Sequence, residues 1–198
     1  MTALPTALSQ QDAGDVSLYL TQGTHLKNTT LETIEYLTGQ DYHVITIAVT
    51  LPYAIAKRSL LQKNVDMSRI HYIDTLTKYS LGPHIPEAPQ CIFLSSPADL
   101  TNLGIAITET LHRVPEGKRC VILDDISTLL LYSPSDTVLK FLHFMVTKLR
   151  LQDVDGILFS VDKVLAPQIL AQMQILMDTI VVLDSPDTKG KGAVATGS

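Results

Sequence analysis

The most informative stretch of the sequence is Val121-Ile122-Leu123-Asp124-Asp125, in which a short apolar run ends in two aspartates. A run of this length, rich in large and β-branched side chains, predicts a strand that is buried on both faces of a sheet. Runs of the same kind occur before and after it along the chain. Together they predict strands at residues 17–22, 43–49, 70–74, 91–95, 120–124, 156–161 and 179–183.

Helix start signals follow several of these runs. Pro52 predicts a helix start after the second run, because proline cannot donate a backbone hydrogen bond and is tolerated in a first turn. In Ser96-Pro97-Ala98-Asp99 and in Ser133-Pro134-Ser135-Asp136, serine is placed as the N-cap, proline at the first helical position and an acid at the third. The proline-rich stretch at residues 81–89 predicts a loop.

Strands that alternate with helices predict the fold class. We expect a three-layer, doubly wound α/β domain with a mostly parallel sheet at residues 16–184. The remaining segments are expected to be a flexible N-terminus at 1–15 and a disordered tail at 185–198, which is rich in Gly, Ser, Thr and Lys. Ligands of such sheets bind beyond the carboxyl ends of the strands, so a site is expected after the first, second and fifth runs.

The composition argues against several classes of protein. A net charge of -5 opposes general nucleic-acid binding, which depends on clustered Lys and Arg. No apolar stretch approaches the ~18 residues of a membrane span, and the cytoplasm is the expected location. Cys91 and Cys120 lie in apolar runs and are expected to be buried thiols, and the histidines have no paired spacing suited to zinc.

The segment after the first run lies where a phosphate-binding loop would lie. It reads Gly23-Thr24-His25-Leu26-Lys27-Asn28-Thr29-Thr30. A working loop needs a glycine before the helix, then a lysine for the β and γ phosphates, then a hydroxyl for magnesium. Aligned on Gly23, those three places hold Asn28, Thr29 and Thr30, so only the first glycine and the final hydroxyl are kept. Lys27 lies two places early.

Two interpretations of this segment remain open. In the structural one, Thr29-Thr30-Leu31-Glu32 is a capping box that satisfies the amides at the helix start, and the Glu32 carboxylate opposes an anion there. In the other, the segment is a weakened nucleotide site. Its residues would be Gly23, Lys27, Asn28, Thr29 and Thr30.

The acidic pair also has two interpretations. Aspartates that end an apolar strand hold magnesium in phosphate-loop enzymes, and Thr30, Asp124 and Asp125 would be the ligands here. Alternatively, Asp125 caps or turns the chain, because an aspartate readily accepts hydrogen bonds from amides two residues further on.

In their order along the chain, these pieces resemble the archaeal and bacterial KaiC-like and RecA-like ATPases. The resemblance is strongest to shortened prokaryotic relatives that lack catalytic motifs, and it extends over most of residues 16–184. The stretches that carry it are residues 48–53, 66–74, 96–100 and 121–129. In active KaiC-like members the second strand ends in adjacent glutamates, one of which prepares the attacking water. This chain has Thr50 and Leu51 in that neighbourhood.

The resemblance therefore implies a RecA-like fold and argues against ATP hydrolysis. We expect a non-catalytic domain, a pseudo-ATPase without a cofactor, that acts as a regulatory, sensory or protein-interaction module in signalling. Its partner would be another protein or further copies of itself. The alternative is a weak or partner-completed ATPase that binds ATP and Mg²⁺ through Lys27, Thr30 and Asp124. Nucleic-acid binding would need a basic stripe that the composition does not indicate.

Overall fold

The computed structural model describes residues 4–9, 13–85 and 87–183. Its strands are β1 Val16–Thr21, β2 His43–Ala48, β3 Ile70–Asp74, β4 Cys91–Phe93, β5 Arg119–Leu123, β6 Asp155–Val161 and β7 Thr179–Val182. They form a seven-stranded sheet in the order β4-β3-β2-β5-β6-β1-β7, and every strand pair is parallel. Each predicted strand is confirmed, with its ends moved by two residues at most.

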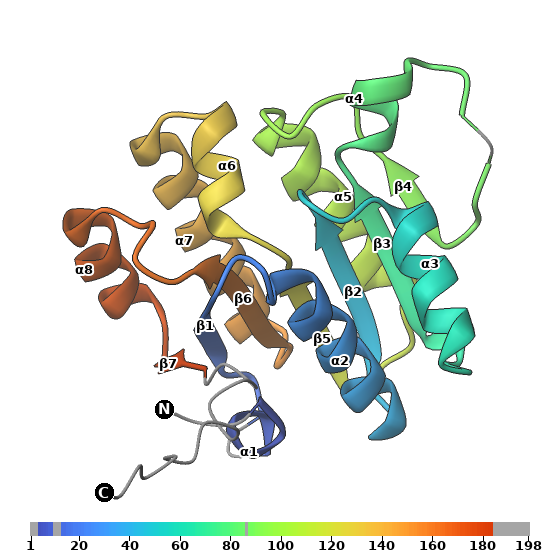
Figure 1. Cartoon of the computed structure of the whole chain (residues 1–198), viewed down its shortest axis with the longest axis horizontal. Coiled ribbons are helices and arrows are strands. Elements are labelled where there is room, and N and C mark those ends of the chain that lie inside the picture. The colour runs from blue at the N-terminus through green and yellow to red at the C-terminus, as the bar shows by residue number, and fades with distance from the viewer. Residues whose placement is uncertain (1–3, 10–12, 86, 184–198) are drawn as a thin grey trace, which may run out of the picture.

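Helices cover both faces of this sheet (Figure 1). They are α1 Leu4–Leu8, α2 Leu26–Gly39, α3 Tyr53–Gln62, α4 Thr77–Leu81, α5 Leu100–Arg113, α6 Ile126–Tyr132, α7 Ser135–Leu151 and α8 Pro167–Leu176. Buried side chains of α1, α2 and α3 pack on one face, and those of α5, α6, α7 and α8 pack on the other. The predicted three-layer α/β fold with a parallel sheet is confirmed.

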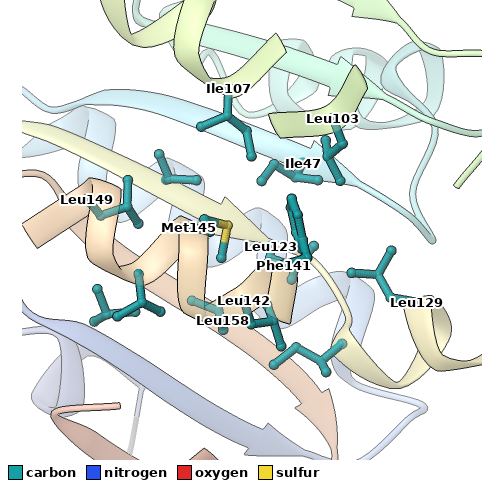
Figure 2. Packing of buried hydrophobic residues seen from close by; sticks show 14 of the residues in the cluster. Ile47, Leu103, Ile107, Leu123, Leu129, Phe141, Leu142, Met145, Leu149 and Leu158 are labelled. Atoms are coloured by element: carbon teal, nitrogen blue, oxygen red, sulfur yellow. The ribbon is translucent and has the colours of Figure 1, made fainter. Parts of the chain in front are cut away.

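The core on the α5 and α7 side consists of aliphatic side chains from strands and helices (Figure 2). Leu103 and Ile107 of α5 lie over Ile47 of β2, and α7 places Met145 and Leu142 near Leu123 and Leu158 of the sheet. All of these side chains are buried completely or almost completely. Each contributes roughly 1.5–3 kcal/mol of hydrophobic stabilisation, so the domain is held mainly by packing against the sheet.

The two helix starts predicted from a serine followed by a proline differ from the sequence prediction. The predicted Ser96 cap is wrong, because α5 begins at Leu100 and its N-cap is Asp99, whose carboxylate accepts from the Asn102 amide at 3.1 Å. The Ser96 hydroxyl instead accepts from the Ala98 amide at 3.1 Å in the preceding turn. The predicted Ser133 cap is also wrong, because the N-cap of α7 is Pro134 and Ser133 is the C-cap of α6. Pro52 precedes α3 as predicted.

Three other features bear on the sequence predictions. Helix α1 was not predicted, yet its Ala7 and Leu8 are buried. The proline-rich loop is confirmed from residue 82 onward among the described residues, and Leu81 ends α4. The predicted tail at 185–198 lies outside the described residues. None of the helices in the described ranges has the length and apolar character of a membrane span.

Candidate functional site

The connection between β1 and α2 is short. Strand β1 ends at Thr21 and α2 begins at Leu26, which leaves residues 22–25 between them. The turn is closed by the Gln22 carbonyl oxygen, which accepts from the amides of His25 and Leu26 at 2.9 and 3.1 Å. Residues 28–30 would stand at the end of a phosphate loop if the loop motif is aligned on Gly23. In the structure they lie inside the helix.

The predicted capping box at residues 29–32 is wrong. The N-cap of α2 is His25, and its side chain makes no capping hydrogen bond. Thr30 lies in the helix, where its hydroxyl donates to the Leu26 carbonyl oxygen at 3.0 Å. The helix starts earlier than predicted because Leu26 is buried and extends the apolar side of α2 towards its N-terminus.

The structure divides the five candidate nucleotide residues into two groups. Gly23, Lys27 and Asn28 are exposed in the turn and the first helical turn, whereas Thr29 and Thr30 are buried. Gly23 does not have a positive φ, and a Cβ added there would lie 3.6 Å from a Val161 methyl group, an ordinary contact. The backbone conformation therefore does not require a glycine at this position.

Asp124 follows β5 and accepts four hydrogen bonds. One oxygen accepts from the Val49 amide at 2.8 Å. The other accepts from the amide and hydroxyl of Thr50, at 3.0 and 2.8 Å, and from the Leu51 amide at 2.9 Å. Asp124 is 1% exposed, and burial raises its pKa to about 6 although the four donors act in the opposite direction. Asp124 therefore fixes the start of the β2–α3 loop, residues 49–52.

Asp74, the last residue of β3, fixes the other end of the same loop. Its carboxylate accepts from the Tyr53 amide at 2.8 Å, and from the Leu76 and Thr77 amides at 2.8 Å each. The Thr77 hydroxyl adds a fourth bond at 2.7 Å. Because β2 lies between β3 and β5, the two carboxylates hold the loop after β2 from both neighbouring strands. Asp74 was not among the predicted site residues, although an aspartate at the end of a predicted buried strand was a usable signal.

Asp125 caps α6, as one of the two interpretations predicted. Its carboxylate accepts from the amides of Ser127 and Thr128 at 3.0 Å each and from both of their hydroxyl groups. A carboxylate offers about four lone-pair positions, and Asp74, Asp124 and Asp125 each accept at least four hydrogen bonds from the chain itself. As they stand, these carboxylates act as hydrogen-bond acceptors for loops and helix starts.

The predicted magnesium ligands come from separate parts of the sheet edge. Asp124 and Asp125 are adjacent after β5, but Thr30 belongs to the helix after β1, and β6 lies between these two strands. Strands β1 and β5 are therefore two strand spacings apart, which corresponds to about 10 Å. Within the described ranges, no cluster of three or more His, Cys, Asp and Glu side chains has a geometry suited to a metal ion.

The three-layer α/β fold is similar to that of KaiC-like proteins. The KaiC-like protein PH0186 from Pyrococcus horikoshii OT3 superposes with a TM-score of 0.62 and 14% identity, over 90% of this chain and 75% of that one. Protein PH0250 of the same organism superposes with a TM-score of 0.59 and 10% identity, over 92% of this chain and 88% of that one. The uncharacterised protein PH0321 from Pyrococcus horikoshii, whose structure was solved in complex with an unknown peptide, superposes with a TM-score of 0.64 and 13% identity, over 90% of this chain and 81% of that one.

The chain belongs to a family of unknown function, DUF7504, whose model matches residues 13–183. No curated protein matches the sequence. The structural similarities, all at low identity, establish the fold.

Proposed function

We propose that the protein is a non-catalytic KaiC-like domain, a pseudo-ATPase, that acts in the cytoplasm as a regulatory or sensory module by binding another protein. The observation that carries the proposal is the connection of residues 22–25 between β1 and α2. A phosphate loop wraps its anion with successive backbone amides, and this connection closes on the Gln22 carbonyl oxygen instead.

The acidic edge supports the same proposal. Phosphoryl transfer needs a cation, a positioned water and charge stabilisation around the phosphate. Asp124 is buried and both of its oxygens accept hydrogen bonds from residues 49–51, so a magnesium ion would compete with these bonds. Thr50 and Leu51, which stand near the position of the water-preparing glutamate in active KaiC-like proteins, donate to Asp124 and carry no base.

Two further observations favour protein binding as the retained role. Large apolar side chains are exposed on several helices, and such surfaces commonly mark protein-interaction sites. The similar protein PH0321 was crystallised with an unknown peptide. Neither observation requires a nucleotide.

ATP hydrolysis and calorimetric binding of Mg·ATP by the purified protein test the proposal. We expect no binding at millimolar nucleotide and no turnover above the uncatalysed background. Lys27→Ala is the matched variant, because Lys27 is exposed and its loss should leave the fold intact. Turnover at roughly 1 s⁻¹ or faster that falls in Lys27→Ala would refute the proposal, because that is an ordinary enzyme rate.

The alternative is a weak or partner-completed ATPase that uses Lys27, Thr30 and Asp124. It predicts that turnover appears only when the protein self-associates or meets its partner, so the assay is repeated over a wide range of protein concentration. A rate per molecule that rises with concentration and depends on Lys27 would establish this alternative. A flat background rate at every concentration would exclude turnover completed by a second copy.

A further inference from the structure

The outer side of α7 combines exposed apolar side chains with basic ones. Phe144 is 46% exposed and Leu151 is 81% exposed, although the opposite side of the helix supplies the core. Lys140 and Lys148 lie one helical turn before and after Phe144. The Cα atoms of the two lysines are therefore about 12 Å apart along the helix axis, and the residue midway between them is aromatic.

Open grooves lie on both sides of this helix. The groove between α5 and α7 has a volume of about 500 Å³, and its walls include Ile105 and Phe144. The groove between α7 and α8 has a volume of about 360 Å³ and includes Ile175, which is 82% exposed. A third hollow, about 470 Å³, continues along α7 to Leu151. The three hollows share wall residues on α7 and form one continuous surface, called the α7 face below.

Phe144 is held in place before any partner arrives. A Cβ at Gly104 of α5 would lie 3.2 Å from the Phe144 ring, so the missing side chain lets the ring lie close against α5. The Lys148 ammonium group lies 5.8 Å from the centroid of the same ring. A preordered aromatic side chain loses little conformational entropy on binding, which favours its use as an anchor.

The charges of the α7 face indicate the kind of partner. Glu109 on its α5 wall is paired with Arg113 at 2.9 Å. Lys140 and Lys148, and Asp136 in the wall of the α7–α8 groove, have no ion-pair partner among the described residues. In a chain with a net charge of -5, the two unpaired ammonium groups outnumber the one unpaired carboxylate, so this face is net positive beside its apolar surface. Complementary carboxylates would favour association and fix the orientation of the partner.

We propose that the α7 face binds an amphipathic helix of another protein, with apolar side chains on one face and carboxylates along its flanks. Grooves between helices accept such segments through anchors at positions i, i+4 and i+7. A second copy of this chain is disfavoured, because a two-fold contact centred on Phe144 would place Lys140 of each copy beside Lys148 of the other. The inference rests on the proposed protein-binding function and adds the surface and the partner chemistry.

Designed peptides of about 18 residues, about 27 Å as a helix, test the inference. One carries Leu and Phe at helical spacing with flanking Glu, a second carries Lys in place of Glu, and a third carries Ser in place of the apolar anchors. Binding to the full chain is measured by fluorescence anisotropy. The protein variants are Phe144→Ala, the pair Lys140→Glu and Lys148→Glu, and the control pair Lys57→Glu and Arg58→Glu, which makes the same charge change on exposed positions of α3.

The Glu peptide should bind the wild-type chain and the α3 control equally. Its affinity should fall about tenfold or more for Phe144→Ala and for the α7 charge pair, and the Lys peptide should prefer the charge-reversed protein. Absence of binding at millimolar peptide, or equal binding to all variants, would overturn the inference. Tighter binding of a labelled single-stranded oligonucleotide than of the Glu peptide to the α7 face would also overturn it. So would a dimer, detected by light scattering, that Phe144→Ala dissociates. None of these outcomes affects the nucleotide assays that test the proposed function.

Discussion

At the scale of single residues, Asp124 shows why the acidic pair could not be interpreted from the sequence alone. An aspartate that ends a buried strand can bind a cation or accept backbone hydrogen bonds, and the local sequence is the same in both cases. The decisive donors, Val49, Thr50 and Leu51, are more than seventy residues away along the chain. Asp125 was predictable because its donors, Ser127 and Thr128, are its near neighbours.

Asp124→Asn should destabilise the protein, by roughly 1–3 kcal/mol, because the amide NH₂ group must face a backbone donor that the carboxylate now satisfies. The loss of stability caused by Asp124→Asn should be smaller at high pH than at low pH. Burial raises the pKa of Asp124 to about 6, so the unfolded chain ionises before the folded one and wild-type stability falls as the pH rises towards 6.

Urea unfolding of wild type and Asp124→Asn at about pH 5 and about pH 7.5 measures this effect. The stability difference between the two proteins should shrink by about 1 kcal/mol at the higher pH, since one unit of pKa corresponds to about 1.4 kcal/mol. A difference that grows with pH would show that the four donors outweigh burial and lower the pKa.

Gly23→Ala should be almost neutral, because the residue does not have a positive φ and the added methyl group meets Val161 at an ordinary 3.6 Å. We expect the melting temperature to change by less than about 2 °C. A glycine needed for close approach of phosphates would be just as neutral in stability, so nucleotide binding is measured in the same variant. Loss of a measurable nucleotide affinity in Gly23→Ala would contradict the account.

At the scale of elements, the strands were predictable, whereas the starts of α2 and α5 were not. Continuous apolar runs such as the one in β5 identify strands buried on both faces, since a covered parallel sheet leaves no polar face. Helix starts depend on which residue first packs against the sheet. Leu26 is buried, so α2 begins before the Thr29-Thr30 pair that resembled a cap. Asp99, rather than Ser96, precedes the first buried residue of α5.

The contact between β1, β6 and α7 should be intolerant of one added carbon atom. Gly156 of β6 is paired with Val16 of β1, and a Cβ there would lie 2.7 Å from one Val16 methyl group and 3.1 Å from Leu149 of α7. Gly156→Ala should therefore cost about 1–3 kcal/mol through overpacking.

Gly39→Ala, at the end of α2, is the matched control, because no atom lies within 4 Å of the added Cβ. It should be neutral or slightly stabilising, since alanine favours helix over glycine by up to about 1 kcal/mol. Thermal unfolding followed by circular dichroism compares the two variants. Equal melting temperatures would mean that the strands and α7 separate easily enough to admit the methyl group.

At the scale of the whole molecule, the sheet has a fold similar to that of KaiC-like proteins, and the carboxylates at its carboxyl edge accept hydrogen bonds from the chain's own loops and helix starts. The hydrogen bonds accepted by three aspartates, and the short connection of residues 22–25, stabilise the loops after β1, β2, β3 and β5. The candidate binding surface lies instead along α7, on the outer side of the helical layer. The alternation of strands and helices predicted the fold, but the allocation of hydrogen bonds at the edge depends on contacts between distant residues.

The most direct test of this account is an NMR titration of the backbone amides of residues 22–30 with Mg·ADP and Mg·ATP. We predict that these amide resonances do not move at millimolar nucleotide, because the turn is closed on the Gln22 carbonyl oxygen and Thr30 donates within its own helix. Saturable shifts centred on Lys27, Asn28 and Thr29 and absent in Lys27→Ala would contradict the account, since they would place the phosphates over this helix start.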